Sequence, residues 1–198
     1  MSRFIETIHL KNGEFLNLLY HQERIDRTFR EFFPGSTPLQ LHGILKDTCN
    51  PSAGRYKYTL RYSDSFEGMN IIKYEPRKIS RLFLKYVSML NYSYKNADRE
   101  IFEILREGLK DDEEILIVKN GYITDSTYSN LIFFDGNRWI TPSTPLLKGT
   151  KRSKLLREGI IFEDTIRPRD LKRYERCSLI NAMLDPGETE VEIKNVFS

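Results

Sequence analysis

Short strand-like segments joined by Asn-Gly or Asp-Gly turns constrain the fold of this chain most. Asn12-Gly13, Asn120-Gly121 and Asp135-Gly136 each separate two runs rich in aliphatic and aromatic residues. Two-residue hairpin turns favour these dipeptides, because both turn positions often require a positive φ. We therefore predict three β-hairpins, formed by the segments 4–18, 114–126 and 130–142.

Helical spacing of apolar residues predicts three helices, over residues 21–33, 98–109 and 150–159. Pro34-Gly35 ends the first helix, Asp98 is the candidate N-cap of the second, and Gly159 occupies the position after the third. One more short helix is expected over residues 168–175. Runs that alternate polar and apolar residues, or that are rich in β-branched and aromatic residues, predict further strands. We expect these strands over residues 55–63, 69–76, 81–87, 160–166, 177–183 and 188–197.

This series of hairpins and short helices has no regular βαβ alternation, which is typical of an α+β protein. The chain has 198 residues, enough for one large or two small hydrophobic cores. We expect two domains: a small N-terminal α+β domain over residues 1–78 and a C-terminal α+β domain over residues 79–198. No internal repeat and no low-complexity segment interrupts them.

Composition excludes several classes of protein. Hydrophobic residues make up 39% of the chain, aromatic residues 12%, and the net charge is +3, which argues against a disordered chain. No apolar run is long enough for a membrane helix or a signal peptide, so we expect a soluble, cytoplasmic protein. Lys and Arg are interspersed with acids, which indicates a mixed-charge surface and no nucleic-acid partner.

The cysteines and histidines, which commonly bind metals, do not have the spacing of a metal site. Cys49 and Cys177 are far apart, so we expect two reduced thiols. The three histidines, His9, His21 and His42, have no metal-ligand spacing. The sequence therefore predicts no metal site.

Residues 147–153, LKGTKRS, form a candidate anion site. A glycine followed by a basic helix presents free backbone N–H groups and the positive end of the helix dipole. Thr144 stands where a nucleotide-binding phosphate loop would need its first glycine, so that motif is excluded. Taken alone, the segment is also consistent with an ordinary loop-to-helix turn.

Lys95 is a candidate amine nucleophile. It precedes a predicted helix and lies near Tyr86, Tyr92 and Tyr94, and a lysine that is partly desolvated among rings can lose its proton more easily. Most lysines near tyrosines are nevertheless surface residues. Arg27 and Asp125, considered singly, would likewise be a helix surface residue and a turn residue.

The order of these motifs carries more information than any one of them. HxxRIDR on the first helix is followed by Lys95, then by D-S-x-x-S-N-L-I-F from Asp125, W-I-T-P, and L-L-K-G-x-x-R. This series resembles the class IV aminotransferases, which are the fold-type IV pyridoxal-phosphate enzymes. They include branched-chain aminotransferase, D-amino-acid aminotransferase and 4-amino-4-deoxychorismate lyase. The resemblance extends from about residue 4 to about residue 183 and is strongest over residues 113–152.

The resemblance implies a role for each matching residue and pyridoxal 5'-phosphate as the cofactor. Lys95 matches the lysine that forms the internal aldimine, and Asp125 stands where the family has a glutamate facing the pyridine nitrogen. The remaining matches concern the cofactor ring and its phosphate. Arg27 matches the arginine that binds the phosphate, Leu147 the aliphatic residue on the ring, Thr150 and Lys151 the residues whose backbone N–H groups hold the phosphate, and Asn181 and Ala182 a late turn at the phosphate or substrate carboxylate.

Three departures from the family pattern affect these expectations. Asp125 is one methylene shorter than glutamate, Lys151 replaces a common hydroxyl residue, and Arg27 and Lys95 are only 68 residues apart. The N-terminal domain is therefore shortened, in an otherwise D-amino-acid aminotransferase-like fold. Because that domain forms much of the substrate pocket in the family, the substrate is not implied.

We consider three functions. The first is a transaminase that converts an amino acid to a keto acid, and the second is a lyase of the 4-amino-4-deoxychorismate type, which releases pyruvate. The third is a non-catalytic binding protein that has kept the fold, a reading that Asp125 and the shortened domain motivate. The family resemblance further implies a homodimer.

Overall fold

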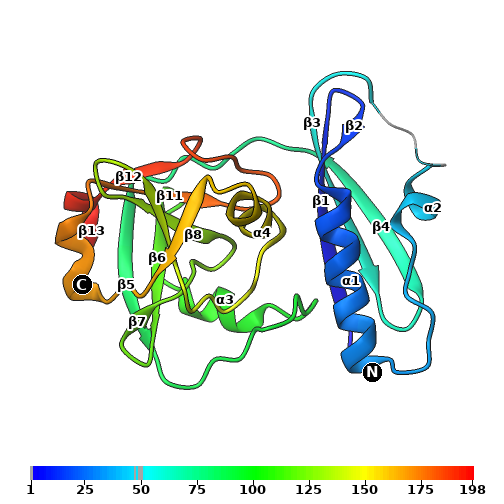
Figure 1. Ribbon diagram of the computed structural model, residues 1–198, viewed down its shortest axis with the longest axis horizontal. Helices are drawn as coiled ribbons and strands as arrows, with labels where there is room; N and C mark the ends of the chain where they lie inside the picture. Colours follow the sequence, from blue (N-terminus) through cyan, green and yellow to red (C-terminus); the bar gives the residue numbers. More distant parts are fainter. Residues whose placement is uncertain (1, 47, 49–50) are drawn as a thin grey trace. The chain divides into compact units, whose positions relative to one another are not determined.

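The computed structural model describes residues 2–46, 48 and 51–198, which divide into two compact units (Figure 1). Unit 1 comprises Met1–Glu75 and Tyr94–Asp98, and unit 2 comprises Pro76–Ser93 and Arg99–Ser198. The expected division into domains 1–78 and 79–198 differs from these units in two respects, because residues 76–78 belong to unit 2 and the short segment around Lys95 belongs to unit 1. Cys49 lies outside the described residues, whereas Cys177 is a buried free thiol.

Unit 1 is an antiparallel four-stranded sheet whose one face is covered by a long helix (Figure 1). In sheet order its strands are β2 (Glu14–Phe15), β1 (Phe4–Lys11), β3 (Arg55–Tyr62) and β4 (Phe66–Lys73). The helices are α1 (Leu18–Phe32) and α2 (Leu41–Leu45). Alternate residues of β1 point inward and join a core cluster with α1, α2 and β3. This cluster contains Phe4, Ile8, Leu10, Ile25, Phe29, Phe33, Leu41, Leu45, Tyr58, Leu60 and Tyr62.

The first predicted hairpin is confirmed. β1 and β2 pair antiparallel on either side of Asn12 and Gly13, whose φ angles of 50° and 86° are the positive values that this turn requires. The first helix, however, begins at Leu18 rather than at residue 21. It has no side-chain N-cap, because Asn17 adopts a left-handed conformation with φ 59° and its side chain makes no cap hydrogen bond.

The segment Tyr94–Asp98, which we call the Lys95 segment, continues the sheet of unit 1 alongside β1. The Ile5 N–H donates to the Lys95 carbonyl at 3.0 Å, and the Ala97 N–H donates to the Arg3 carbonyl at 2.9 Å. An isolated antiparallel bridge joins Phe4 to Asn96. The backbone of Lys95 is thus fixed by the first strand of the chain.

Unit 2 contains two sheets, one of five strands and one of four (Figure 1). In sheet order the first has β10 (Ile161–Asp164), β9 (Trp139–Pro142), β8 (Asn130–Phe134), β11 (Arg176–Ile180) and β12 (Glu190–Glu192). The second has β13 (Val196–Phe197), β5 (Arg81–Val87), β6 (Glu113–Lys119) and β7 (Tyr122–Ile123). The helices are α3 (Glu100–Leu105), α4 (Thr150–Arg157) and the 3-10 turns η1 (Pro168–Arg173) and η2 (Ile193–Asn195).

The other two predicted hairpins are confirmed as β6–β7 and β8–β9, although the second is closed by the loop Asp135–Arg138 and not by a two-residue turn. Unit 2 also contains parallel pairs that the turn signals did not indicate. β5 pairs parallel with β6, and β9 pairs parallel with β10. Each pair is joined through a short helix, α3 or α4, so the unit holds two βαβ connections. The mixed α+β fold class is confirmed, with these connections added to it.

Two local predictions were wrong. The cap of α3 is Arg99 and not Asp98, and α3 itself covers only Glu100–Leu105 of the predicted 98–109. The last predicted strand, 188–197, is split by η2 into β12 and β13, which belong to different sheets. Among the described residues, no helix is long and apolar enough to cross a membrane, and no group of His, Cys, Asp and Glu could hold a metal ion.

Candidate active site

Asp125 is a buried carboxylate just after β7, and three hydrogen-bond donors converge on it. Oδ2 accepts from the backbone N–H groups of Leu146 and Leu147 at 2.5 and 3.0 Å, and Oδ1 accepts from Asn130 Nδ2 at 2.6 Å. Burial raises the pKa of Asp125 to about 6, although these hydrogen bonds lower it. Since a carboxylate has about four acceptor sites, one remains on Oδ1 for a further donor.

Asn130 connects Asp125 to the start of α4. Its Nδ2 also donates to the Leu147 carbonyl at 2.8 Å. A Cβ atom added at Gly149 would lie 2.1 Å from Asn130 Oδ1, so only glycine fits this close approach. Hydrogen bonds therefore connect Asp125, Asn130 and the turn 146–149 into one rigid network.

The first turn of α4 has the features of an anion site. Gly149 is its N-cap and offers no side-chain acceptor, and the first turn contains no acidic residue. The first N–H groups of a helix have no acceptor within the helix and form the positive end of its dipole. Thr150, Lys151 and Arg152 are buried there. The structure thus places the predicted residues Leu147, Thr150 and Lys151 directly beside the hydrogen-bonded partners of Asp125.

The side chain of Lys151 does not extend freely from this turn. Its Nζ forms a salt bridge with Asp185, and the Lys151 side chain is only 5% exposed. Lys151 can therefore contribute a backbone N–H to an anion, while its charge is already balanced by a carboxylate. Lys151 stands where the family commonly has a hydroxyl residue, and its charge is engaged within the protein.

Asn181 organises a turn and joins it to the loop Ser126–Ser129, which we call the Asp125 loop. Asn181 Nδ2 donates to Ser129 Oγ at 2.9 Å, and its Oδ1 accepts from the N–H groups of Met183 and Leu184 at 2.8 and 3.1 Å. Ala182 is buried within the same turn. Both predicted residues therefore lie close to the Asp125 loop, with the Asn181 amide engaged by the protein itself.

The three tyrosines that lie near Lys95 in the sequence belong to different units. Tyr94 packs against the core of the unit and forms an edge contact with Phe32. Tyr86 is 63% exposed on β5, and the Tyr92 ring packs edge-on against Phe102, both in unit 2. Within unit 1, hydrogen bonds to β1 fix the backbone of Lys95.

Arg27 on α1 carries an unsatisfied buried donor. Its Nη2 is buried and has no hydrogen-bond partner among the described residues, and its guanidinium lies 5.7 Å from the centre of the Tyr94 ring. Buried polar groups are nearly always paired, so an orphan nitrogen calls for an explanation. An anionic ligand is one chemical group that would satisfy it.

A buried ionic cluster of Glu6, His21 and Arg24 was missed by sequence reasoning. Arg24 Nε and Nη2 donate to the two oxygens of Glu6 at 2.7 and 2.6 Å, and His21 Nδ1 lies 2.6 Å from Oε2. Burial alone would raise the pKa of Glu6, but Arg24 and His21 together hold it at about 2. Burial lowers the pKa of His21, against the opposing effect of Glu6, which favours a neutral ring donating from Nδ1.

Two signals in the sequence pointed to this cluster. Glu6 occupies an inward position of β1, between Phe4 and Ile8, where an acid requires a partner. His21 and Arg24 are three residues apart on one face of α1, so both can meet the same strand residue. The pairing itself spans 15 and 18 residues, which no local pattern determines.

The chain belongs to the amino-transferase class IV family, whose pattern it matches over residues 3–185. A protein of Haemophilus influenzae that has no assigned function is 34% identical over 187 residues, which are 92% of this chain and 98% of that one. A crystal structure from Haemophilus somnus, provisionally named a 4-amino-4-deoxychorismate lyase, is 30% identical. It superposes with a TM-score of 0.86, over 92% of this chain and 97% of that one.

More distant solved structures share the fold. A provisionally named amino-acid aminotransferase from Mesorhizobium loti is 22% identical, with a TM-score of 0.79 over 97% of this chain and 99% of that one. A hypothetical aminotransferase from Mycobacterium tuberculosis, solved in a form that binds pyridoxal phosphate, is 15% identical with a TM-score of 0.73 over 98% of this chain and 81% of that one. The predicted fold-type IV architecture is thereby confirmed.

Family membership implies a pyridoxal-phosphate-dependent enzyme that acts on a small amino acid or keto acid. The described residues fit this cofactor at the level of each unit. Unit 1 provides an orphan arginine nitrogen, at Arg27, and a primary amine, at Lys95. Unit 2 provides an uncapped helix start at Gly149 and a buried carboxylate, Asp125, with one acceptor site left. An anion, an aldehyde and a pyridine nitrogen call for these groups.

Proposed function

We propose that the protein is a pyridoxal-phosphate-dependent enzyme that acts on an amino acid, with Lys95 as its catalytic amine. The observation that most supports this is that Asp125 is hydrogen-bonded to the turn that leads directly into α4. Asp125 binds the N–H groups of Leu146 and Leu147, and the next residues form a basic helix start without an acidic cap. A proton-holding carboxylate and an anion site built as one piece are suited to a ligand that has a basic ring nitrogen and a phosphate.

Each proposed residue then has a definite task. Arg27 and the backbone N–H groups of Thr150 and Lys151 bind the phosphate, which anchors the cofactor independently of its reactive end. The side chain of Leu147 packs on the ring. Asp125 holds a proton at the ring nitrogen through its remaining acceptor site.

When bound, pyridoxal phosphate supplies an aldehyde for the substrate amine and a ring that withdraws electrons from the substrate α-carbon. Lys95 Nζ removes the α-proton as a general base and returns it as a general acid. Asn181 and Ala182 form the turn that faces the phosphate or the substrate carboxylate in this proposal. Because the Asn181 side chain is already hydrogen-bonded, we assign it to shaping this turn.

Two reactions use the same groups, and we propose transamination first. The second candidate is cleavage of 4-amino-4-deoxychorismate with release of pyruvate. It is favoured by the Haemophilus somnus structure and by a Schizosaccharomyces pombe protein provisionally named an aminodeoxychorismate lyase, which is 36% identical over 78 residues. Only 37% of this chain and 34% of that protein take part in the latter match.

The two reactions are separated by their products. With an amino acid alone, a transaminase releases one equivalent of keto acid and leaves the cofactor aminated, because half of its cycle needs no second substrate. With 4-amino-4-deoxychorismate, a lyase releases pyruvate repeatedly. Keto acid measured after addition of single amino acids, and pyruvate measured with the chorismate derivative, assign the reaction.

Covalent chemistry at Lys95 is tested by absorbance and borohydride reduction. The wild-type protein with added pyridoxal phosphate should develop a visible absorbance band, and reduction followed by peptide mapping should find the cofactor on Lys95. Lys95→Ala should bind the cofactor through its phosphate without that band, whereas Lys85→Ala, the control on β5, should retain it. Absence of a reduced adduct on any lysine of the wild-type protein would favour a non-catalytic binding protein.

The phosphate role of Arg27 has its own test. Arg27→Ala removes one charge-assisted hydrogen bond, so the Kd for pyridoxal phosphate should rise about ten- to a hundredfold. Fluorescence titration measures this, with Arg30→Ala as an exposed control on the same helix. An unchanged Kd in Arg27→Ala would refute the phosphate role of Arg27.

We also propose that the protein is a homodimer in the cytoplasm, as the family resemblance implies. Light scattering of the purified protein at micromolar concentration should give twice the mass of the 23.4 kDa chain. A monomer that forms the Lys95 adduct would show that one chain suffices for cofactor binding.

A further inference from the structure

Arg99 is the residue at which the chain leaves the Lys95 segment and re-enters unit 2. Its guanidinium makes two hydrogen bonds within that unit. Nη1 donates to the Tyr92 hydroxyl at 3.2 Å, and Nη2 donates to the Thr127 carbonyl at 2.7 Å. Tyr92 lies just before the Lys95 segment, and Thr127 is in the Asp125 loop. The residue that directly follows the segment is therefore bonded to a residue just before the segment and to the loop that follows the buried carboxylate.

Aromatic contacts restrict the Arg99 side chain further. Its guanidinium carbon lies 5.8 Å from the centre of the Tyr92 ring and 5.1 Å from that of Phe102. Both rings are buried, and they pack edge-on with centres 4.7 Å apart. Arginine suits this position, because its planar fork donates in fixed directions while its face stacks on rings.

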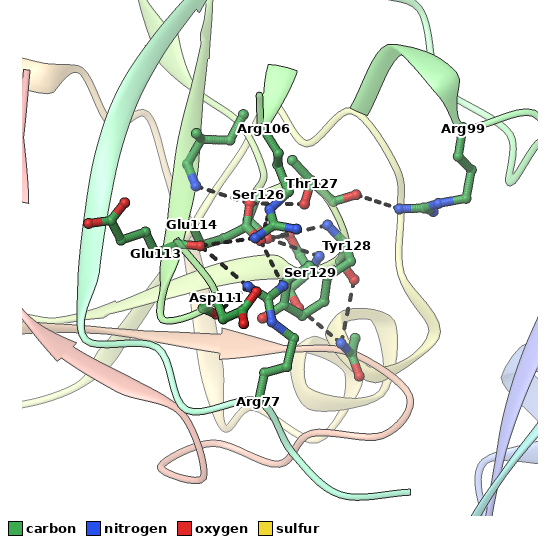
Figure 2. A network of polar contacts seen from close by, with 12 residues as sticks. Arg77, Arg99, Arg106, Asp111, Glu113, Glu114, Ser126, Thr127, Tyr128 and Ser129 are labelled. Carbon is green, nitrogen blue, oxygen red and sulfur yellow. Dashed lines mark hydrogen bonds and ion pairs between the residues drawn. The ribbon is translucent and has the colours of Figure 1, made fainter. Parts of the chain in front are cut away.

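The Asp125 loop is rigid where Arg99 meets it. Thr127 Oγ1 donates to Glu114 Oε1 at 2.9 Å, and Glu114 is fully buried and paired with Arg77 and Arg106 (Figure 2). Ser126 Oγ accepts from the Ser129 N–H at 3.0 Å and closes the loop on itself. In Figure 2, Arg99 and Glu114 reach Thr127 from different sides. The Thr127 carbonyl that accepts from Arg99 therefore belongs to a rigid loop.

We propose that Arg99 is a positioning residue that fixes both ends of the Lys95 segment and ties them to the Asp125 loop. This inference rests on the proposed function, because it gives Arg99 the task of fixing the chain on both sides of the catalytic amine. The backbone bonds to β1 fix one side of the segment, and Arg99 fixes its two ends. Arg99 itself touches neither the substrate nor the cofactor in this proposal.

Amide hydrogen exchange of the protein without cofactor tests the clamp directly. Arg99→Met keeps the length and apolar contacts of the side chain but loses both hydrogen bonds. Exchange should accelerate at least tenfold at Asn96 and Ala97 and within the Asp125 loop, since a charge-assisted bond shifts a local opening equilibrium by about that factor or more. Exchange in the middle of α1 should stay unchanged.

Arg106→Met is the matched control. Arg106 closes the other side of the network, through Glu114 and the Glu113 carbonyl, and has no bond to the Lys95 segment. This variant should accelerate exchange in the Asp125 loop but leave Asn96 and Ala97 at the wild-type rate. Equal acceleration of Asn96 and Ala97 in both variants would mean general loosening of unit 2 and would overturn the proposal.

Two milder variants decide the question if Arg99→Met does not fold. Tyr92→Phe keeps the ring contacts but removes one acceptor, so it should give a smaller acceleration of the same amides. Arg99→Lys keeps the charge but can reach only one acceptor at a time. The exchange rates of the same amides should therefore exceed those of the wild type and should not exceed those of Tyr92→Phe. Wild-type exchange in both variants would refute the clamp.

A cofactor readout separates this inference from the proposed function. Borohydride trapping of pyridoxal phosphate on Lys95 should be at least tenfold slower in Arg99→Met than in Arg106→Met. If the wild-type protein traps no cofactor, the proposed function fails, whereas the exchange data still decide whether Arg99 fixes the segment. If exchange responds as expected but both variants trap the cofactor at the wild-type rate, the positioning role is overturned.

Discussion

Glu6 in unit 1 and Asp125 in unit 2 are both buried carboxylates, yet their surroundings shift their pKa values in opposite directions. Glu6 is paired with the cation of Arg24 and with His21, and its pKa is held at about 2. Asp125 accepts only neutral donors, from Leu146, Leu147 and Asn130, and burial raises its pKa to about 6. Burial costs both groups their hydration, so the charge of the partner decides whether the carboxyl group titrates far below neutrality or close to it.

This difference separates an acid with a structural role from the acid that we propose as functional. Glu6 stays ionised over the whole physiological range and serves to hold α1 on β1. Asp125 lies close to its titration point and can share a proton with a basic nitrogen. A perturbed pKa next to an anion site is the more informative of the two signals.

The largest expected effect comes from breaking the ionic cluster of unit 1. Glu6→Gln leaves the Arg24 charge buried without its partner, which should lower the free energy of unfolding by about 3–5 kcal/mol. Urea denaturation measures this loss. Glu67→Gln, which breaks the exposed pair with Arg3, is the control and should cost about 0–1 kcal/mol. Equal losses of unfolding free energy in Glu6→Gln and Glu67→Gln would show that the buried cluster stabilises the protein no more than an exposed ion pair.

The pH dependence of stability should show the two carboxylates in separate windows. The pKa of Glu6 is lowered from 4.5 to about 2, so its contribution is complete above pH 4.5 and is lost as the pH falls toward 2. The pKa of Asp125 is raised from 3.8 to about 6, so its contribution is complete below pH 3.8 and is lost as the pH rises toward 6. Each change is on the order of 3 kcal/mol by linkage.

Asp125→Asn isolates the second window. The variant should lose the decline in stability between about pH 4 and pH 6, while the acid-side loss due to Glu6 remains. Denaturation at a series of pH values compares the two proteins. A decline that persists in Asp125→Asn would assign the titration to another group.

A smaller effect is expected from crowding the turn that Asp125 holds. Gly149→Ala places a Cβ against Asn130, whose amide binds both Asp125 and Leu147, so the free energy of unfolding should fall by about 1–3 kcal/mol. Gly43→Ala, in α2 and with no atom within 4 Å of the added Cβ, should be neutral or stabilising by up to about 1 kcal/mol. A neutral Gly149→Ala would show that the Asn130 side chain can move aside.

Local chemistry made the strands and turns predictable from the sequence. Asn12-Gly13 and Asn120-Gly121 have the positive φ angles that their identity suggests, and each joins the two strands expected on either side. The Gly149 turn was also found, because a glycine before a basic helix is visible in the sequence. These features depend on a few adjacent residues.

The features that sequence reasoning missed depend on contacts between distant residues. Glu6 finds Arg24 only when α1 folds back on β1, and Arg99 finds Thr127 across 28 residues. The parallel pairing of β5 with β6 likewise depends on a crossover that no turn signal marks. Asp98 was predicted as a cap from its type alone, but the chain at that point is still held in unit 1, so α3 begins one residue after Arg99.

The return of the Lys95 segment to unit 1 has a consequence for the order of events during synthesis. Residues 1–75 leave the ribosome first, but the edge of β1 beside Phe4 and Ile5 has no strand to pair with until residues 94–98 have followed. An unpaired strand edge is a site where other chains can add and aggregate. While residues 76–93 are emerging, the nascent chain therefore exposes one more strand edge than the finished unit, and a chaperone that covers this edge would protect it.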